Sequence, residues 1–161
     1  MAHEELPRED LLREATALVE RVELVPTAPC RDQSIVAGFR PDGALSIFFG
    51  EEEVYHFNAV GALRRVYLDG HLYKALSGEL VRLTRVRTTQ QVELRSRALE
   101  SAEKANFVVA LQSRLAALAT DMAVGMFEVR REVPPNANVV DRLRDWLTGH
   151  PAVPIATRPN A

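Results

Sequence analysis

The alternation of apolar and polar positions divides the chain into helical and strand-forming parts. Near the N-terminus four apolar residues recur at helical spacing, namely Leu11, Ala15, Leu18 and Val22. This spacing is typical of an amphipathic helix, and we predict one from Pro7 to about Val22. Pro7 suits the first turn, where its missing N–H would be unpaired anyway. Residues 25–32 show no usable period and are predicted to be a connection or an edge strand.

Between Ser34 and about Ala98, runs of β-branched and aromatic residues alternate with turn signals at intervals of roughly 8 to 12 residues, as in consecutive antiparallel strands. The dipeptide Asp69-Gly70 strongly favours a two-residue hairpin turn, and Ser77-Gly78 favours one more weakly. Turn type fixes register. These turns therefore predict which residues face each other across neighbouring strands.

The second half of the chain predicts two helices and one strand. Apolar residues form a stripe on a helix from Ser101 to about Val124, namely Phe107, Leu111, Leu115, Leu118 and Met122. Residues 126–133 are predicted as a strand, and a short helix capped by Asn138 follows, ending at Gly149. From His150 onward, several prolines and the lack of a period indicate a flexible tail or a segment that packs on a partner.

These elements predict an α+β fold. An antiparallel meander of about six or seven strands packs against the long helix in the C-terminal half, with a short helix near each end of the chain. The 161 residues are enough for one domain. We assign residues 1–149 to a single domain and residues 150–161 to a proline-rich flexible tail.

Composition narrows the protein classes. Hydrophobic residues make up 47% and charged residues 26%, which excludes collagen and intrinsically disordered chains. The net charge of −2 gives no overall attraction to nucleic acid or to an anionic membrane. Because the N-terminus has no basic start followed by an apolar stretch, and Cys30 is the one cysteine, we expect a cytoplasmic protein that does not span a membrane.

Positive charge is nevertheless concentrated in one region. Residues 62–97 hold eight basic and three acidic groups, a net charge of +5. The predicted register places Arg65 opposite Lys74. Like charges directly opposite on a sheet destabilise it, so this pair invites an anion or an acidic neighbour, which residues 51–53, three glutamates, could supply.

A second group of basic residues is predicted beside tyrosines. The register places Arg64 and Arg82 on one sheet face with Tyr55 and Tyr73, an arrangement suited to stacking and to phosphate contact in single-stranded nucleic acid. The alternative is that the arginines lay their stems over the sheet and pair with acids of the N-terminal helix. Residues 1–25 carry a net charge of −4, which makes that pairing possible.

Few residues point to catalysis. The weak candidates for an acid or base are His56, predicted opposite Leu63, and His71, which follows the Asp69-Gly70 turn. The four histidines lack the spacing of zinc ligands, and neither a glycine-rich phosphate loop nor a Gly-x-Ser-x-Gly motif is present. We therefore predict no metal and no cofactor, and we expect a protein that is not an enzyme.

Three functions remain open. The first is a binding or assembly module whose arginine-rich sheet meets an anionic partner, either nucleic acid or an acidic protein surface, with affinity that falls steeply with salt. The second is a small-molecule binder or enzyme with an apolar cavity between sheet and long helix, by analogy with helix-grip and cystatin-like folds. The third is a homo-oligomer that pairs apolar sheet faces or edge strands.

Overall fold

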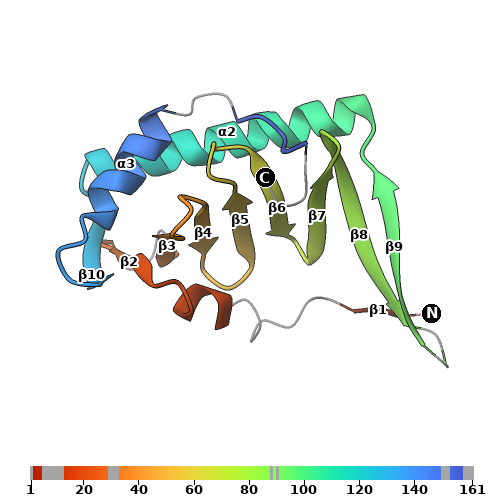
Figure 1. Ribbon diagram of the computed structural model, residues 1–161, viewed down its shortest axis with the longest axis horizontal. Coiled ribbons are helices and arrows are strands. Elements are labelled where there is room, and N and C mark those ends of the chain that lie inside the picture. The colour runs from red at the N-terminus through yellow and green to blue at the C-terminus, as the bar shows by residue number, and fades with distance from the viewer. Residues whose placement is uncertain are drawn as a thin grey trace.

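The computed structural model describes residues 2–4, 13–28, 33–87, 89, 91–149 and 153–157. Over these residues the chain forms an antiparallel ten-stranded sheet, with helices α2 (Ser101–Ala123) and α3 (Val139–Gly149) on one face (Figure 1). This arrangement confirms the predicted α+β class, the long helix in the second half and the short C-terminal helix. No helix among the described residues is long and apolar enough to cross a membrane.

The sheet is larger than the predicted meander. The strands are β1 (Ala2–Glu4), β2 (Glu20–Pro26), β3 (Ile35–Phe39), β4 (Leu45–Phe49), β5 (Glu53–Phe57), β6 (Leu63–Leu68), β7 (His71–Leu76), β8 (Glu79–Arg87), β9 (Val92–Ala98) and β10 (Phe127–Val133). Their order is β1-β8-β7-β6-β5-β4-β3-β2-β10, with β9 also paired to β8. Strands β3 to β9 are the predicted seven-strand meander, and β1, β2 and β10 extend it.

The two short hairpin turns adopt the conformation that their sequences favour. Both central residues of each turn have positive φ, at 53° and 79° for Asp69 and Gly70 and at 54° and 80° for Ser77 and Gly78. This geometry matches the right-handed twist of the flanking strands. It sets the predicted register, in which Arg65 pairs with Lys74 and Tyr73 with Arg82.

A β-bulge alters the predicted register between β5 and β6. His56 pairs with Arg65, and Phe57 pairs with Leu63, so Arg64 is the extra residue on β6. The prediction that His56 faces Leu63 is therefore wrong. An extra residue in one strand changes which face the following side chains occupy, so Leu63 lies on the helix-covered face and Arg65 lies on the opposite one.

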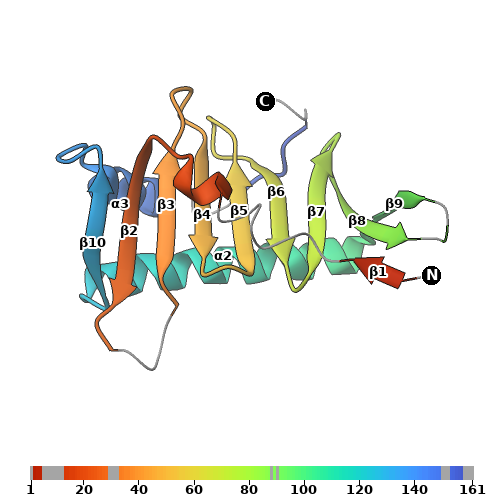
Figure 2. The same ribbon diagram turned by 90° about the horizontal axis from the view of Figure 1, so that it is seen from below.

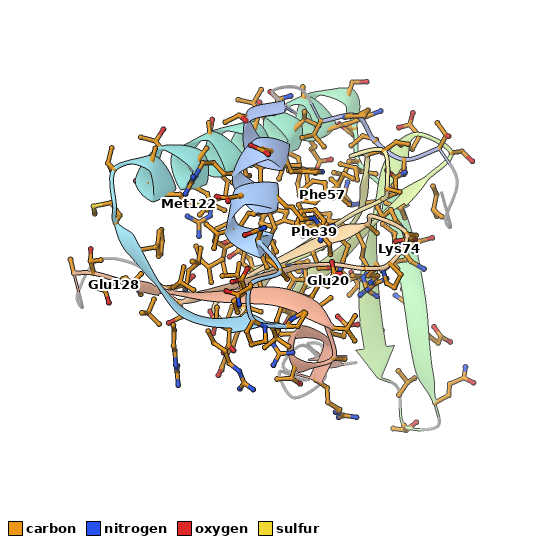
Figure 3. The ribbon with its side chains drawn as sticks, turned by 60° about the vertical axis from the view of Figure 1, so that its left-hand side comes forward. Glu20, Phe39, Phe57, Lys74, Met122 and Glu128 are labelled. Carbon is orange, nitrogen blue, oxygen red and sulfur yellow. The ribbon has the colours of Figure 1, made fainter. Side chains whose placement is uncertain are left out.

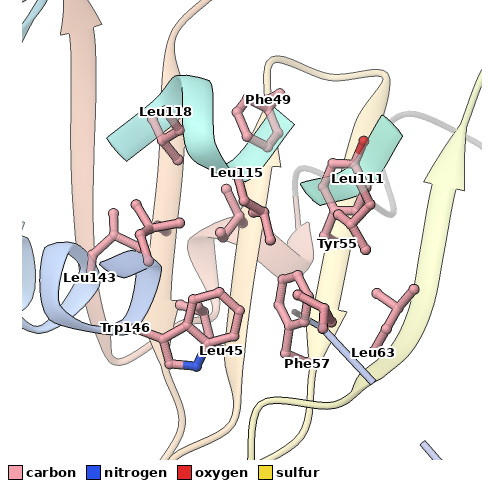
Figure 4. Packing of buried hydrophobic residues seen from close by; sticks show 14 of the residues in the cluster. Leu45, Phe49, Tyr55, Phe57, Leu63, Leu111, Leu115, Leu118, Leu143 and Trp146 are labelled. Atoms are coloured by element: carbon pink, nitrogen blue, oxygen red, sulfur yellow. The ribbon is translucent and has the colours of Figure 1, made fainter. Parts of the chain in front are cut away.

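The main core fills the space between the sheet and the two helices. Phe39 and Phe57 lie in this layer (Figure 3), and the ring of Phe57 is 4.6 Å from that of Trp146 on α3. From α2, the buried residues of the predicted stripe are Leu111, Leu115 and Leu118 (Figure 4). Side chains fill most of this layer, and a pocket of about 220 Å³ remains between β5, β6 and α2, lined by Glu53, Tyr55, Leu68, Phe107, Ala110, Leu111 and Arg114.

The N-terminal helix ends before the predicted limit at Val22. Residues 13–16 are helical, whereas β2 begins at Glu20; residues 7–12 lie outside the described part. Val22 and Leu24 are buried and alternate with half-buried polar neighbours, the two-residue period of a strand. The sequence Glu-Arg-Val-Glu-Leu-Val carries this signal, which a helical interpretation of the preceding residues obscures.

The short helical segment covers part of the second sheet face. In Figure 2 it lies in front of the strands while α2 runs behind them. Ala15 and Leu18 pack there against Phe48, Val54 and Tyr67. The second apolar face thus has an intramolecular cover over Phe48, Val54 and Tyr67.

Part of the expected tail is packed on the domain. Leu63 on β6 donates its N–H to Pro154 O at 2.8 Å and accepts a hydrogen bond from Ala156 N at 2.9 Å. Val153 and Ala156 are buried. Residues 153–157 therefore belong to the folded unit, while residues 150–152 and 158–161 lie outside the described part.

Candidate anion-binding site

A row of polar residues crosses the sheet on the face opposite α2. Ser46 on β4 pairs with His56 on β5, His56 pairs with Arg65 on β6, and Arg65 pairs with Lys74 on β7. Directly opposite residues on antiparallel strands project to the same face. These four residues, called the polar row below, therefore share one surface.

A cavity of about 320 Å³ opens beside the polar row. The described residues that line it are Glu14, Arg40, His56, Arg64, Arg65, Lys74 and Ala75. Four of the seven are basic, and Glu14 is the carboxylate among them. With His56 neutral, these lining groups carry a net charge of +3. We call this space the cationic cavity.

Hydrogen bonds hold the buried end of the polar row in place. His56 is 6% exposed, and its Nδ1 lies 2.7 Å from the hydroxyl of Ser46, which is 2% exposed. Arg65 Nη2 lies 3.0 Å from His56 Nε2. A guanidinium can only donate, so in neutral His56 the Nε2 atom accepts from Arg65 and the Nδ1–H donates to Ser46.

Glu14 balances part of the positive charge. Its carboxylate lies 3.0 Å from Arg65 Nη2 and 3.5 Å from His56 Nε2. Interaction with His56, followed by the charge and hydrogen bond of Arg65, lowers the pKa of Glu14 to about 2 although burial opposes this change. Glu14 is therefore ionised at neutral pH and holds the Arg65 side chain at the edge of the cavity.

The pKa of His56 is lowered chiefly by burial, which disfavours the imidazolium. The charges of Arg65 and Arg40 lower it further, whereas the hydrogen bond and charge of Glu14 raise it. His56 is thus neutral at pH 7 and acts as a hydrogen-bonding support for Arg65.

A close backbone approach positions Glu14 over the sheet. A Cβ atom on Gly38 would lie 2.5 Å from Glu20 O and 2.9 Å from Leu18 Cδ1. The segment that leads into β2 can therefore approach β3 this closely only because Gly38 has no side chain. Leu18 packs beside Ala15 in the small cluster on this face. This anchoring holds the short helical segment, and with it Glu14, at the border of the cationic cavity.

The structure separates the six predicted anion-binding residues into two groups. Arg64, Arg65 and Lys74 line the cationic cavity. The other three, Tyr55, Tyr73 and Arg82, lie on the face that α2 covers. The bulge accounts for the one difference from the predicted grouping, because it brings Arg64 to the same cavity as Arg65.

The two tyrosines do not form the expected surface for stacking. Tyr55 is 3% exposed and donates a hydrogen bond to Glu53 Oε2 at 2.5 Å. The ring of Tyr73 packs 4.9 Å from that of Phe107 on α2. Arg82 faces Tyr73 on this side, away from the cationic cavity. Tyr55 is therefore buried, whereas Tyr73 and Arg82 are half-buried on the side of α2.

The remaining candidates are also separated. His56 reaches the cationic cavity, whereas His71 lies on the helix-covered side and contacts Tyr73 edge-on, with ring centres 6.4 Å apart. Glu53, expected as an acidic neighbour of Arg65 and Lys74, instead pairs with Arg114 on α2 at 3.0 Å. Glu14 supplies the carboxylate beside Arg65. For Arg65, this agrees with the alternative in which the arginines of the sheet pair with acids of the N-terminal helix.

Sequence reasoning missed Arg40, Ser46 and Glu14 as parts of the site. Ser46 could have been found from the register of the β4–β5 hairpin, which places it opposite His56. Glu14 lies one helical turn before Leu18 and so shares the face that packs on the sheet. No group of three or more His, Cys, Asp or Glu residues suited to a metal ion occurs in the described part of the chain.

Comparison of the chain with models of protein families, with curated proteins and with solved structures found no match.

Proposed function

We propose that this protein is a binding module that receives an anionic group in the cationic cavity. The observation that carries the proposal is the convergence of four basic side chains on one space of about 320 Å³, with Glu14 as the carboxylate among its described lining residues. Ligand pockets usually have volumes of about 300 to 1,000 Å³, so this one suits a compact group.

The lining chemistry favours phosphate. Arg40, Arg64 and Arg65 each offer a planar guanidinium, which matches phosphate oxygens through paired hydrogen bonds, and Lys74 adds a mobile point charge. A dianionic phosphate neutralises two of the three surplus charges, whereas a carboxylate neutralises one. Tracking of an extended nucleic acid strand is less well supported, because Tyr55 is buried and the half-buried ring of Tyr73 packs against Phe107, on the face opposite the cationic cavity.

The arrangement supports binding rather than catalysis. Ser46, His56 and Glu14 follow one another as hydroxyl, imidazole and carboxylate, the order of groups in some nucleophilic enzymes, but neutral His56 donates its Nδ1–H to Ser46 and so cannot take the hydroxyl proton there. Ser46 is also only 2% exposed, and His56 rather than Ser46 lines the cavity. A substrate in the cavity therefore cannot reach the Ser46 hydroxyl. We propose that this chain of contacts positions Arg65. The lone Cys30 is consistent with action in the cytoplasm.

Calorimetric titration with inorganic phosphate tests the proposal. The double variant Arg40→Gln/Lys74→Gln removes two exposed charges from the cavity and should weaken binding by at least about tenfold, since hydrogen bonds to charged groups contribute roughly 1.5 to 3 kcal/mol each. Arg131→Gln is the control, because Arg131 is an exposed cation on β10. Binding should also weaken with salt. Equal phosphate affinity in both variants would contradict the proposal.

A further inference from the structure

A second pocket adjoins the cationic cavity. It has a volume of about 380 Å³ and is lined by Glu14, Ala17, Leu18, Val19, Phe39, Arg40 and Pro41. Glu14 and Arg40 line both spaces, so the two lie side by side and share that border. We call the second space the apolar pocket.

The apolar pocket is formed by two segments that the fold holds together. Residues 17–19 lead from the short helical segment into β2, and Pro41 belongs to the turn between β3 and β4. Arg40 N donates to Ala44 O at 2.8 Å, and Gly43 N donates to Arg40 O at 2.9 Å, which fixes this turn. The pocket is therefore built on ordered backbone beside the charged site.

The apolar pocket and the cationic cavity differ in chemistry and could hold different parts of one ligand. Five of its seven lining residues are apolar, and Glu14 and Arg40 stand at the border with the cationic cavity. A bare phosphate ion would occupy the charged side alone. A phosphate ester would place its phosphate among the cations and its organic group against Ala17, Val19 and Pro41, where apolar surface leaves water.

From this juxtaposition we propose that the ligand is an organic phosphate monoester, with the phosphate in the cationic cavity and an aromatic or aliphatic group in the apolar pocket. This inference rests on the proposed function. It goes further by assigning the ligand's class and its orientation across the border formed by Glu14 and Arg40.

Three probes separate the two claims: inorganic phosphate, phenyl phosphate and phenol, each titrated into the full chain. Phenyl phosphate should bind about tenfold more tightly than inorganic phosphate, because a partly buried phenyl ring gains about that much from leaving water. Phenol alone should bind weakly, since it lacks the charge. Equal affinity for the two phosphates would overturn the organic-ester inference but leave phosphate binding intact. Failure of both phosphates to bind would overturn the proposed function as well.

Two variants locate the organic group. Ala17→Trp fills the apolar pocket, and Val19→Gln makes its wall polar at a residue that is 62% exposed. In each variant, phenyl phosphate should bind less than about threefold more tightly than inorganic phosphate. This corresponds to losing about half of the free energy that produces the tenfold preference. The affinity for inorganic phosphate should stay the same. Ala116→Trp on the exposed side of α2 and Val60→Gln, at a residue 77% exposed, are the matched controls. An unchanged preference in both pocket variants contradicts the proposed orientation.

Discussion

Replacement of Glu14 by Gln should affect stability and ligand binding in opposite directions. The variant keeps the size of the side chain and removes the negative charge beside Arg65. The ion pair is 3.0 Å long, but the side chains of Arg65 and Glu14 are 35% and 38% exposed. Exposed pairs contribute about 0 to 1 kcal/mol, so the free energy of unfolding at pH 7 should fall by no more than about 1 kcal/mol.

Phosphate affinity should rise in the same variant. A phosphate oxygen hydrogen-bonded to Arg65 would lie within about 6 Å of Glu14, since two bonds of about 3 Å separate them. The repulsion between unit charges at that distance is about 0.7 kcal/mol in water and about 2.8 kcal/mol at an effective dielectric constant of about 20. We take the lower value because Glu14 is partly exposed. The expected gain in affinity is at least about threefold.

Urea unfolding and phosphate titration measure the two effects on the same preparation. The control is Glu128→Gln, which removes an exposed carboxylate from β10, remote from Lys74 in the view of Figure 3. It should leave phosphate affinity unchanged. If Glu14→Gln binds phosphate no more tightly than the native chain, the charge balance deduced for the cationic cavity is incorrect. A loss of stability without a gain in affinity would indicate that the Arg65–Glu14 pair serves the fold alone.

Three further predictions concern the support of the site. Gly38→Ala should lower the free energy of unfolding by about 1 to 3 kcal/mol, because its Cβ would meet Glu20 O at 2.5 Å; urea unfolding measures this, and an unchanged midpoint would refute the close approach. Because the pKa of His56 is lowered, the unfolded chain takes up its proton first, so stability should decline as pH falls below about 6.5. His56→Gln should weaken that dependence in unfolding curves from pH 7 to pH 5, and an identical slope would count against burial of the neutral ring. Leu115→Ala should lower the free energy of unfolding by about 2 to 5 kcal/mol, because it leaves a cavity between the sheet and α2. A decrease below about 1 kcal/mol in urea unfolding, as is usual for substitutions at exposed positions, would show that this layer is not tightly packed.

Local patterns in the sequence were sufficient to predict most of the fold. The Asp69-Gly70 and Ser77-Gly78 turns set the pairing of β6, β7 and β8, because their backbone conformations depend on the residues themselves. The stripe on α2 likewise specified which side meets the sheet. Both features are determined by residues that lie within a few positions of one another in the sequence.

The site depended on features that local patterns do not contain. The bulge at Arg64 is a property of the β5–β6 pair, and it changes the partner of His56 and the face of Leu63. The place of Glu14 depends on how a segment far away in the sequence crosses the sheet at Gly38. The turn registers therefore separated Arg65 and Lys74 from Arg82, whereas the place of Arg64 beside Arg65 did not follow from them.

The pairing of β2 with β10 has a consequence for the order of folding. Thr27 Oγ donates to Met126 O across 99 residues of sequence, whereas β3 to β9 are joined by short hairpin connections. Contacts between distant residues form slowly, because a long loop must close before they gain any stabilisation. Because β2 also pairs with β3, which follows it closely in the sequence, we expect β2 to join the meander early and β10 to add to the free edge of β2 last. During synthesis, this end of the sheet would thus stay incomplete until β10 has left the ribosome.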